Sequence, residues 1–130
     1  MGVLLSGATA TMMTLRRLEG RLRQLRKSSS SADAQLVDLL LQVTGSWRSN
    51  AESPARLGSS LAKAHGNVWF STEESSNAVC DLLDEIRKTI DSLGSMTLNE
   101  RLIVLDLKDR WDAASDAQRE QLRAKLSAPA

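Results

Sequence analysis

The two side chains best suited to nucleophilic chemistry at neutral pH are the single cysteine, Cys80, and the single histidine, His65. A cysteine–histidine dyad requires both groups within hydrogen-bond reach and a thiol that ionises readily. Asp81 follows Cys80 directly and Asp84 lies one helical turn further on, and their carboxylates oppose thiolate formation. His65 precedes Gly66 at the expected end of a helix, where a cation interacts well with the helix dipole. We therefore predict a small, half-buried packing cysteine and a capping or surface histidine.

Four aspartates recur at spacings of three or four residues, namely Asp106, Asp109, Asp112 and Asp116. Di-iron sites in helical bundles use Glu-x-x-His motifs, and the sequence has none. Lys108 and Arg110 interleave with the aspartates, which is typical of a solvated helix face that pairs its own charges. Glycine-rich phosphate loops, G-x-S-x-G and H-E-x-x-H are missing from the sequence. We therefore expect no catalytic residues, metal, cofactor or small-molecule substrate, and hence a non-enzyme.

The segment Leu15–Lys27 has the pattern of a basic amphipathic helix. Its leucines follow a 3-4-3 spacing that places them on one side of a helix: Leu15, Leu18, Leu22 and Leu25. The candidate partner-binding residues are its six cations, Arg16, Arg17, Arg21, Arg23, Arg26 and Lys27. The leucine side must lie on the protein's own core, on a partner or on a membrane surface. We predict a non-catalytic protein–protein interaction module, an adaptor or regulator, whose partner is another protein or a second copy of itself.

Two alternative functions use the same segment. Its cations could neutralise phosphates, which makes a nucleic-acid-binding regulator the second hypothesis, although Gln24 is its only amide for reading bases. The third hypothesis is a membrane-peripheral protein, because the first six residues fit the M-G-x-x-x-[ST] pattern for myristoylation of Gly2. A membrane partner is the less expected of the two.

Charge is distributed unevenly along a chain whose net charge is +1. Residues 1–30 hold six cations and one anion, whereas residues 71–95 hold six anions and two cations. The two segments are therefore electrostatic complements. They either pack side by side in one chain or face different partners, including a second copy of the chain.

Composition favours an all-α fold in a single domain. The 130 residues include no tyrosine and one phenylalanine, which argues against a β-sandwich. We predict a compact bundle or orthogonal array of about five to six helices at residues 11–126, with a flexible lead at 1–10 and a flexible tail at 127–130. Apolar runs are too short for a membrane span, so a cytoplasmic location is expected.

Capping signals set the expected helix limits. The six helices are expected from Thr9 or Thr11 to Lys27, and at residues 32–44, 54–65, 72–93, 98–111 and 116–126. Helix starts are indicated by Ser53-Pro54 and by capping boxes at Ser71/Glu74, Thr97/Glu100 and Ser115/Gln118. Gly45, Gly66 and Gly94 are expected to end helices. The helices at 32–44 and 98–111 carry apolar residues on most sides and should be the most buried.

Overall fold

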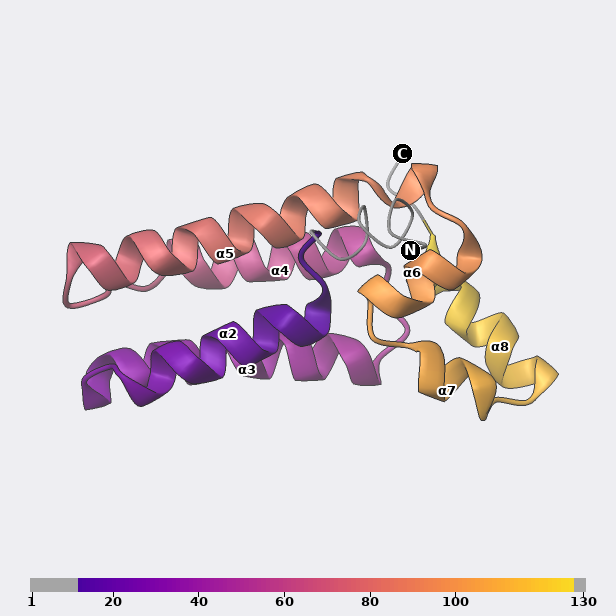
Figure 1. The fold of residues 1–130 in the computed structure, drawn as a ribbon. Coiled ribbons are helices and arrows are strands. Elements are labelled where there is room, and N and C mark those ends of the chain that lie inside the picture. Colours follow the sequence, from indigo (N-terminus) through magenta and orange to yellow (C-terminus); the bar gives the residue numbers. More distant parts are fainter. Residues whose placement is uncertain (1–11, 128–130) are drawn as a thin grey trace, which may run out of the picture.

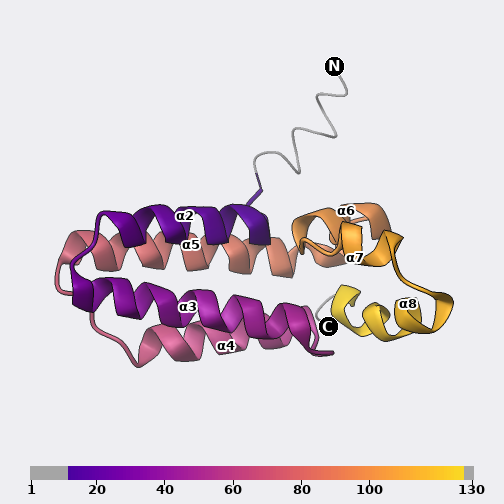
Figure 2. The same cartoon turned by 90° about the horizontal axis from the view of Figure 1, so that it is seen from below.

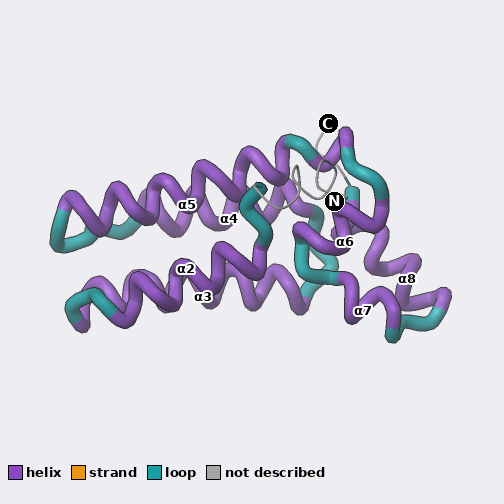
Figure 3. Tube along the Cα trace, viewed as in Figure 1, coloured by secondary structure: helices purple, strands orange, loops and turns teal. Residues whose placement is uncertain are grey.

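Four long helices run in alternating directions and form a closed bundle (Figures 1 and 2). The structure is a computed structural model that describes residues 12–127. The bundle helices are α2 (Leu15–Lys27), α3 (Ser31–Ser49), α4 (Pro54–Gly66) and α5 (Glu73–Asp91). Each packs against the next, and α5 closes the ring against α2. The all-α prediction is confirmed, since the described residues form helices and loops without a strand (Figure 3).

A smaller helical unit follows the bundle and lies at one of its ends (Figure 1). Its elements are the 3-10 helix η1 (Leu93–Ser95), α6 (Leu98–Val104), α7 (Lys108–Asp112), α8 (Asp116–Leu122) and the 3-10 helix η2 (Arg123–Leu126). The described residues thus contain seven α-helices, where five to six were expected. None of these helices is long and apolar enough to cross a membrane.

Three of the predicted helix starts are confirmed. At Thr97 and at Ser115, the side chain accepts from the third residue of the helix, whose own side chain accepts from the capping backbone N–H. These reciprocal bonds satisfy two backbone donors that the first turn would otherwise leave free. Proline at the first position of α4 follows Ser53 as expected, although the Ser53 side chain makes no capping bond.

Two predicted starts are wrong in detail. Helix α2 begins at Leu15 with Thr14 as its cap, whereas Thr9 and Thr11 lie outside the described residues. Helix α5 is capped by Thr72, not by Ser71. Ser71 is engaged elsewhere, because its N–H and hydroxyl both donate to the carboxylate of Asp33. The predicted lead at 1–10 and residues 128–130 of the predicted tail also lie outside the described part of the chain.

Gly45 does not end the third segment, since α3 continues through it to Ser49. A glycine inside a helix costs about 1 kcal/mol relative to alanine. The extra turn carries Trp47 into the core, where it is 3% exposed and donates from Nε1 to the Ser53 carbonyl at 2.8 Å. Burial of an aromatic side chain of this size more than offsets the glycine cost. Similarly, Gly94 lies in η1 because α5 already ends at Asp91.

The helix predicted at 98–111 is broken between Val104 and Lys108. Asp106 adopts a left-handed conformation with φ of 58°, which is unfavourable for most non-glycine residues. The break turns four apolar side chains into the core, each at most 2% exposed: Leu102, Val104, Leu105 and Leu107. A continuous helix would point these positions in different directions, so core burial explains the break. Asp109 and Asp112 consequently lie on α7, whereas Asp106 lies in the break between α6 and α7.

One apolar core joins the bundle to the C-terminal helices. Leu15, Leu18 and Leu22 of α2 are fully buried and Leu25 is half-buried against the same core. Each fully buried leucine contributes about 1.5–3 kcal/mol. Leu39, Leu98 and Ile103 are exposed, so α3 and the 98–111 segment each keep an apolar side chain in solvent. Leu122 and Leu126 of the C-terminal unit are also buried, at 3% exposure each.

Replacing Gly20 with alanine is expected to raise the free energy of unfolding by about 1 kcal/mol. Gly20 lies exposed within α2, and a methyl group at its Cβ position would meet no atom within 4 Å. Chemical denaturation of the two proteins measures the difference. Gly45 in α3 is a second position where a methyl group would meet no atom within 4 Å, so Gly45→Ala should also raise the free energy of unfolding. A loss of stability in both variants would contradict the expectation.

Candidate partner-binding surface

Helix α2 separates its apolar and cationic residues onto opposite sides. Leu15, Leu18 and Leu22 pack in the core of the same chain and are not available to an external partner, whereas Leu25 is half-buried at its edge. All six predicted partner-binding cations are exposed: Arg16, Arg17, Arg21, Arg23, Arg26 and Lys27. Of the three surfaces considered for the leucine side of α2, it is therefore the protein's own core that this side contacts. On this helix, only the basic side remains to contact other molecules.

The six cations differ in their local partners. Arg26 Nε lies 2.6 Å from Asp38 Oδ1 of α3, an exposed ion pair that solvent screens strongly and that adds little to stability. Arg17 donates from Nη1 to the Met12 carbonyl at 3.2 Å. Within residues 12–127 no ion pair is formed by Arg16, Arg21, Arg23 or Lys27. Most of the positive charge of α2 is therefore uncompensated by contacts within the described chain.

The one anion of α2, Glu19, is not part of the basic surface. It is 6% exposed and receives two bonds from the Arg48 guanidinium, at 2.5 and 3.1 Å. The Thr44 hydroxyl donates to the same carboxylate at 3.0 Å. The Glu19 hydrogen bond holds the pKa of Arg48 above its usual value, although burial acts in the opposite direction. Its position one turn after Leu15 and before Leu22 already places Glu19 on the leucine side of the helix.

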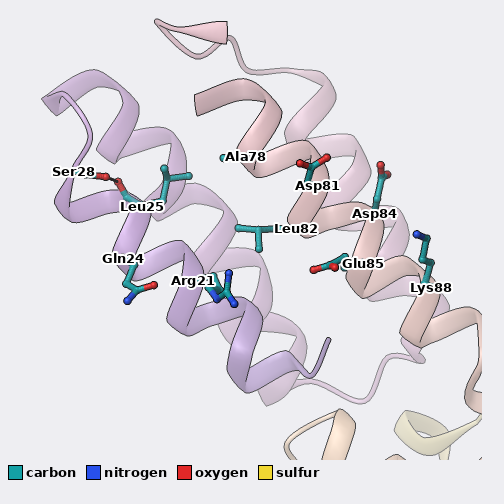
Figure 4. A pocket seen from close by; sticks show the side chains of 10 residues that line it. All are labelled: Arg21, Gln24, Leu25, Ser28, Ala78, Asp81, Leu82, Asp84, Glu85 and Lys88. Carbon is teal, nitrogen blue, oxygen red and sulfur yellow. Dashed lines mark hydrogen bonds between the residues drawn. The ribbon is translucent and has the colours of Figure 1, made fainter. Parts of the chain in front are cut away.

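A groove of about 620 Å³ runs between α2 and α5. Figure 4 shows its lining, which comes from opposite sides: Arg21, Gln24 and Leu25 of α2 with its C-cap Ser28, and Ala78, Asp81, Leu82, Asp84, Glu85 and Lys88 of α5. Leu25 and Leu82 are half-buried and provide an apolar floor. The sequence singled out Arg21 but none of the α5 residues as binding residues.

The groove has walls of opposite charge. Arg21 lies on the α2 wall, whereas Asp81 and Glu85 lie on the α5 wall. The predicted complementarity of the two segments thus corresponds to neighbouring helices, but no ion pair joins α2 to α5 in the described part of the structure. Both walls retain charge that a bound surface of complementary pattern could neutralise.

Cys80 and His65 come together on the other side of α5. Both line a hollow of about 140 Å³ between α4 and α5. Ligand pockets for small molecules are usually about 300–1,000 Å³, so this hollow is too small to enclose a substrate. Cys80 is exposed, so the prediction of a half-buried packing cysteine is wrong.

The aspartate series does not assemble into a metal site. Asp106 pairs with Arg48 at 3.0 Å and Asp112 pairs with Lys108 at 3.1 Å. Among residues 12–127, no group of three or more histidine, cysteine, aspartate or glutamate side chains is placed to hold a metal ion.

Trp69 is the most exposed large apolar side chain of the described residues, at 91%. It lies in the α4–α5 connection, at the bundle end opposite the C-terminal helices (Figure 1). Asp33, 2% exposed, holds this connection by accepting from Ser71 N and Oγ at 2.9 and 2.6 Å.

Lys125 joins the C-terminal helices to the bundle. It is 1% exposed, donates from Nζ to the Trp47 carbonyl and lies 3.4 Å from both Asn50 Oδ1 and the Glu52 carbonyl. Its ammonium lies 3.7 Å from the centre of the Trp47 ring. Burial first, and then the nearby Arg110 charge, lower the pKa of Lys125 to about 8, against the Glu52 charge, which raises it.

The described residues define a four-helix bundle with a C-terminal helical unit and, between α2 and α5, a groove whose walls carry opposite charge. Comparison with protein-family models, with curated protein sequences and with solved structures finds no match.

Proposed function

We propose that this chain is a non-catalytic helical protein–protein interaction module, an adaptor or regulator, that binds its partner through the basic side of α2. One observation carries the proposal. Leu15, Leu18 and Leu22 of α2 are buried in the chain's own core while the six cations of this helix are exposed, and four of these cations form no ion pair with a described residue. The proposed location is cytoplasmic.

A protein surface fits this site better than nucleic acid does. The cations of α2 could contact phosphates, and nucleic-acid binding is the alternative function. However, Asp81, Asp84 and Glu85 of α5 line the groove together with Arg21 and would repel a phosphate backbone there. A protein can present both charge signs at the required spacing, whereas a nucleic acid backbone cannot.

A membrane surface is the third candidate. An interfacial helix inserts its apolar side into lipid, but the apolar side of α2 is occupied by its own core. Gly2 lies outside the described residues, so the lipidation hypothesis rests on the sequence pattern alone.

The proposal is tested by removing charge from α2. Arg16→Gln, Arg21→Gln and Arg23→Gln together should abolish most capture of partner from native lysate, because three exposed cations without ion pairs are lost. The matched control removes three exposed cations elsewhere, with Arg56→Gln, Lys63→Gln and Arg87→Gln. Equal capture by both triple variants would refute the proposed surface. Binding to DNA or RNA at low salt that the α2 triple variant alone loses would favour the alternative.

A further inference from the structure

We propose that the α2–α5 face binds a second copy of this chain across a two-fold axis parallel to the bundle helices. This inference rests on the proposed function and names its partner. It is drawn from the signs of charge on two adjacent helices, the symmetry of a dimer and the groove between them.

The two helices carry opposite exposed charge. Helix α2 presents six cations and no exposed anion, because Glu19 is buried against Arg48. Helix α5 exposes six carboxylates and two cations, which are Glu73, Glu74, Asp81, Asp84, Glu85 and Asp91 against Arg87 and Lys88. The helices are neighbours, and across the groove between them Arg21 of α2 lies opposite Asp81 and Glu85 of α5, so this side of the bundle bears both signs of charge.

The groove dictates what chemistry an occupant must have. It must place acidic groups over α2 and basic groups over α5, separated by the spacing of two packed helices, which is about 8–10 Å. A purely basic peptide would meet Arg21, and a purely acidic one would meet Asp81 and Glu85. The α2–α5 face of a second copy has both signs at this spacing.

Symmetry then selects the orientation of the second copy. In a two-fold dimer both copies use the same patch. An axis in the interface but perpendicular to the helices would place α2 on α2 and α5 on α5, with like charges opposed. An axis parallel to the helices places α2 of each copy on α5 of the other. Only the parallel axis is therefore compatible with the charges.

The parallel axis also sets the register. Rotation about it leaves each residue at its original height along the bundle. Arg21 lines the same groove as Asp81 and Glu85 (Figure 4). In the dimer, Arg21 of one copy therefore lies at the height of Asp81 and Glu85 of the other, and the pairing occurs twice. Lys88 opposes the pairing at one end of the groove.

The size of the face implies a weak dimer. Helix α2 has 13 residues and is about 20 Å long, so two adjacent helices offer about 400 Å². Stable complexes usually bury about 800 Å² per partner. Since its apolar floor is limited to Leu25, Leu82 and Ala78, we expect self-association that is concentration-dependent and sensitive to salt.

Charge reversal tests the dimer by sedimentation velocity over a concentration series at low and high salt. The first variant makes the α2 wall acidic with Arg21→Glu and Gln24→Glu. The second makes the α5 wall basic with Asp81→Lys and Glu85→Lys. Each should weaken self-association at least about tenfold, because like charges then face each other. All four residues line the groove and three of them are exposed charged groups.

Recombination of the variants separates association from folding. An equimolar mixture of the two variants should form a heterodimer, since the acidic α2 meets a basic α5 and the basic α2 meets an acidic α5. The quadruple variant should regain the homodimer for the same reason. Arg56→Glu with Lys63→Glu on α4 changes charge away from the face and should leave the dimer intact. Melting curves followed by circular dichroism check that each variant is folded.

This inference would be overturned by a wild-type protein that remains monomeric at every concentration in low salt, or by a dimer unaffected by either reversal. Monomeric wild type would leave the proposed function standing, because partner capture through Arg16, Arg21 and Arg23 is measured separately. Failure to form the heterodimer from folded variants would also overturn the proposed two-fold arrangement.

Discussion

Replacing Glu19 with alanine is expected to lower the free energy of unfolding by about 3–5 kcal/mol, because removal of one partner strands a partly buried charge. Glu19 is 6% exposed and accepts two bonds from Arg48 and one from Thr44. Arg48 Nε is already without a hydrogen-bond partner in the described structure, so its guanidinium would keep mainly the Asp106 contact at 3.0 Å. Urea denaturation measures the loss.

The double variant Glu19→Leu with Arg48→Met is the control for this prediction. It removes both charges and fills the space with apolar side chains, which is often neutral or stabilising for buried ion pairs. Asp106 is 36% exposed at its side chain and can be solvated in the variant. Recovery of most of the lost stability would assign the cost to the stranded charge. A loss below about 1 kcal/mol for Glu19→Ala would contradict the expected burial penalty.

Stability is expected to rise by up to about 3 kcal/mol between pH 8 and pH 10.5 through Lys125 alone. The folded protein lowers the pKa of Lys125 from its ordinary 10.5 to about 8. In this window the unfolded chain still binds the proton that the folded chain releases, so the free energy of unfolding increases with pH. Contact of the ammonium with the Trp47 ring favours the charged form, which makes the figure an upper limit.

The Lys125→Met variant isolates this contribution, because it keeps the apolar stem and removes the titrating group. Urea denaturation of both proteins at several pH values gives the difference between the two stability curves. The difference in the free energy of unfolding between the two proteins should change between pH 8 and pH 10.5, because only the unfolded chain keeps the Lys125 proton there. Between pH 6 and pH 7 this difference should be constant, since both pKa values of Lys125 lie above that range. Parallel curves across the whole range would show that Lys125 titrates near its ordinary value.

Local signals predicted the parts of the fold that depend on neighbours in the chain. Thr97 with Glu100 and Ser115 with Gln118 form both halves of their capping boxes, because each bond is made within four residues. The leucine spacing in α2 likewise predicted the buried side of that helix. In the candidate site, the exposure of the six cations followed from the same periodicity.

Contacts distant in sequence decided the features that could not be predicted. Ser71 had the spacing of a cap, but the Asp33 carboxylate, 38 residues away, takes both of its donors. Gly45 remains helical because Trp47 gains a buried position beyond it. The break at Asp106 has neither glycine nor proline to mark it, and follows from the apolar residues around it. The sequence did not indicate the α5 residues of the groove as binding residues, because acidic helix faces in solvent are common. Only tertiary packing places the acidic face of α5 beside α2.

Because of where its tryptophans lie, the intrinsic fluorescence of the molecule reports on different places along its length. The chain has three tryptophans and no tyrosine, so its near-ultraviolet emission comes from Trp47, Trp69 and Trp111. Trp69 is in solvent at one end, whereas Trp47 is enclosed at the junction and Trp111 lies under Arg119 and Arg123 in the C-terminal unit. Aqueous quenchers therefore reach Trp69 first, and single-tryptophan variants distinguish opening of the junction from coverage of the opposite end.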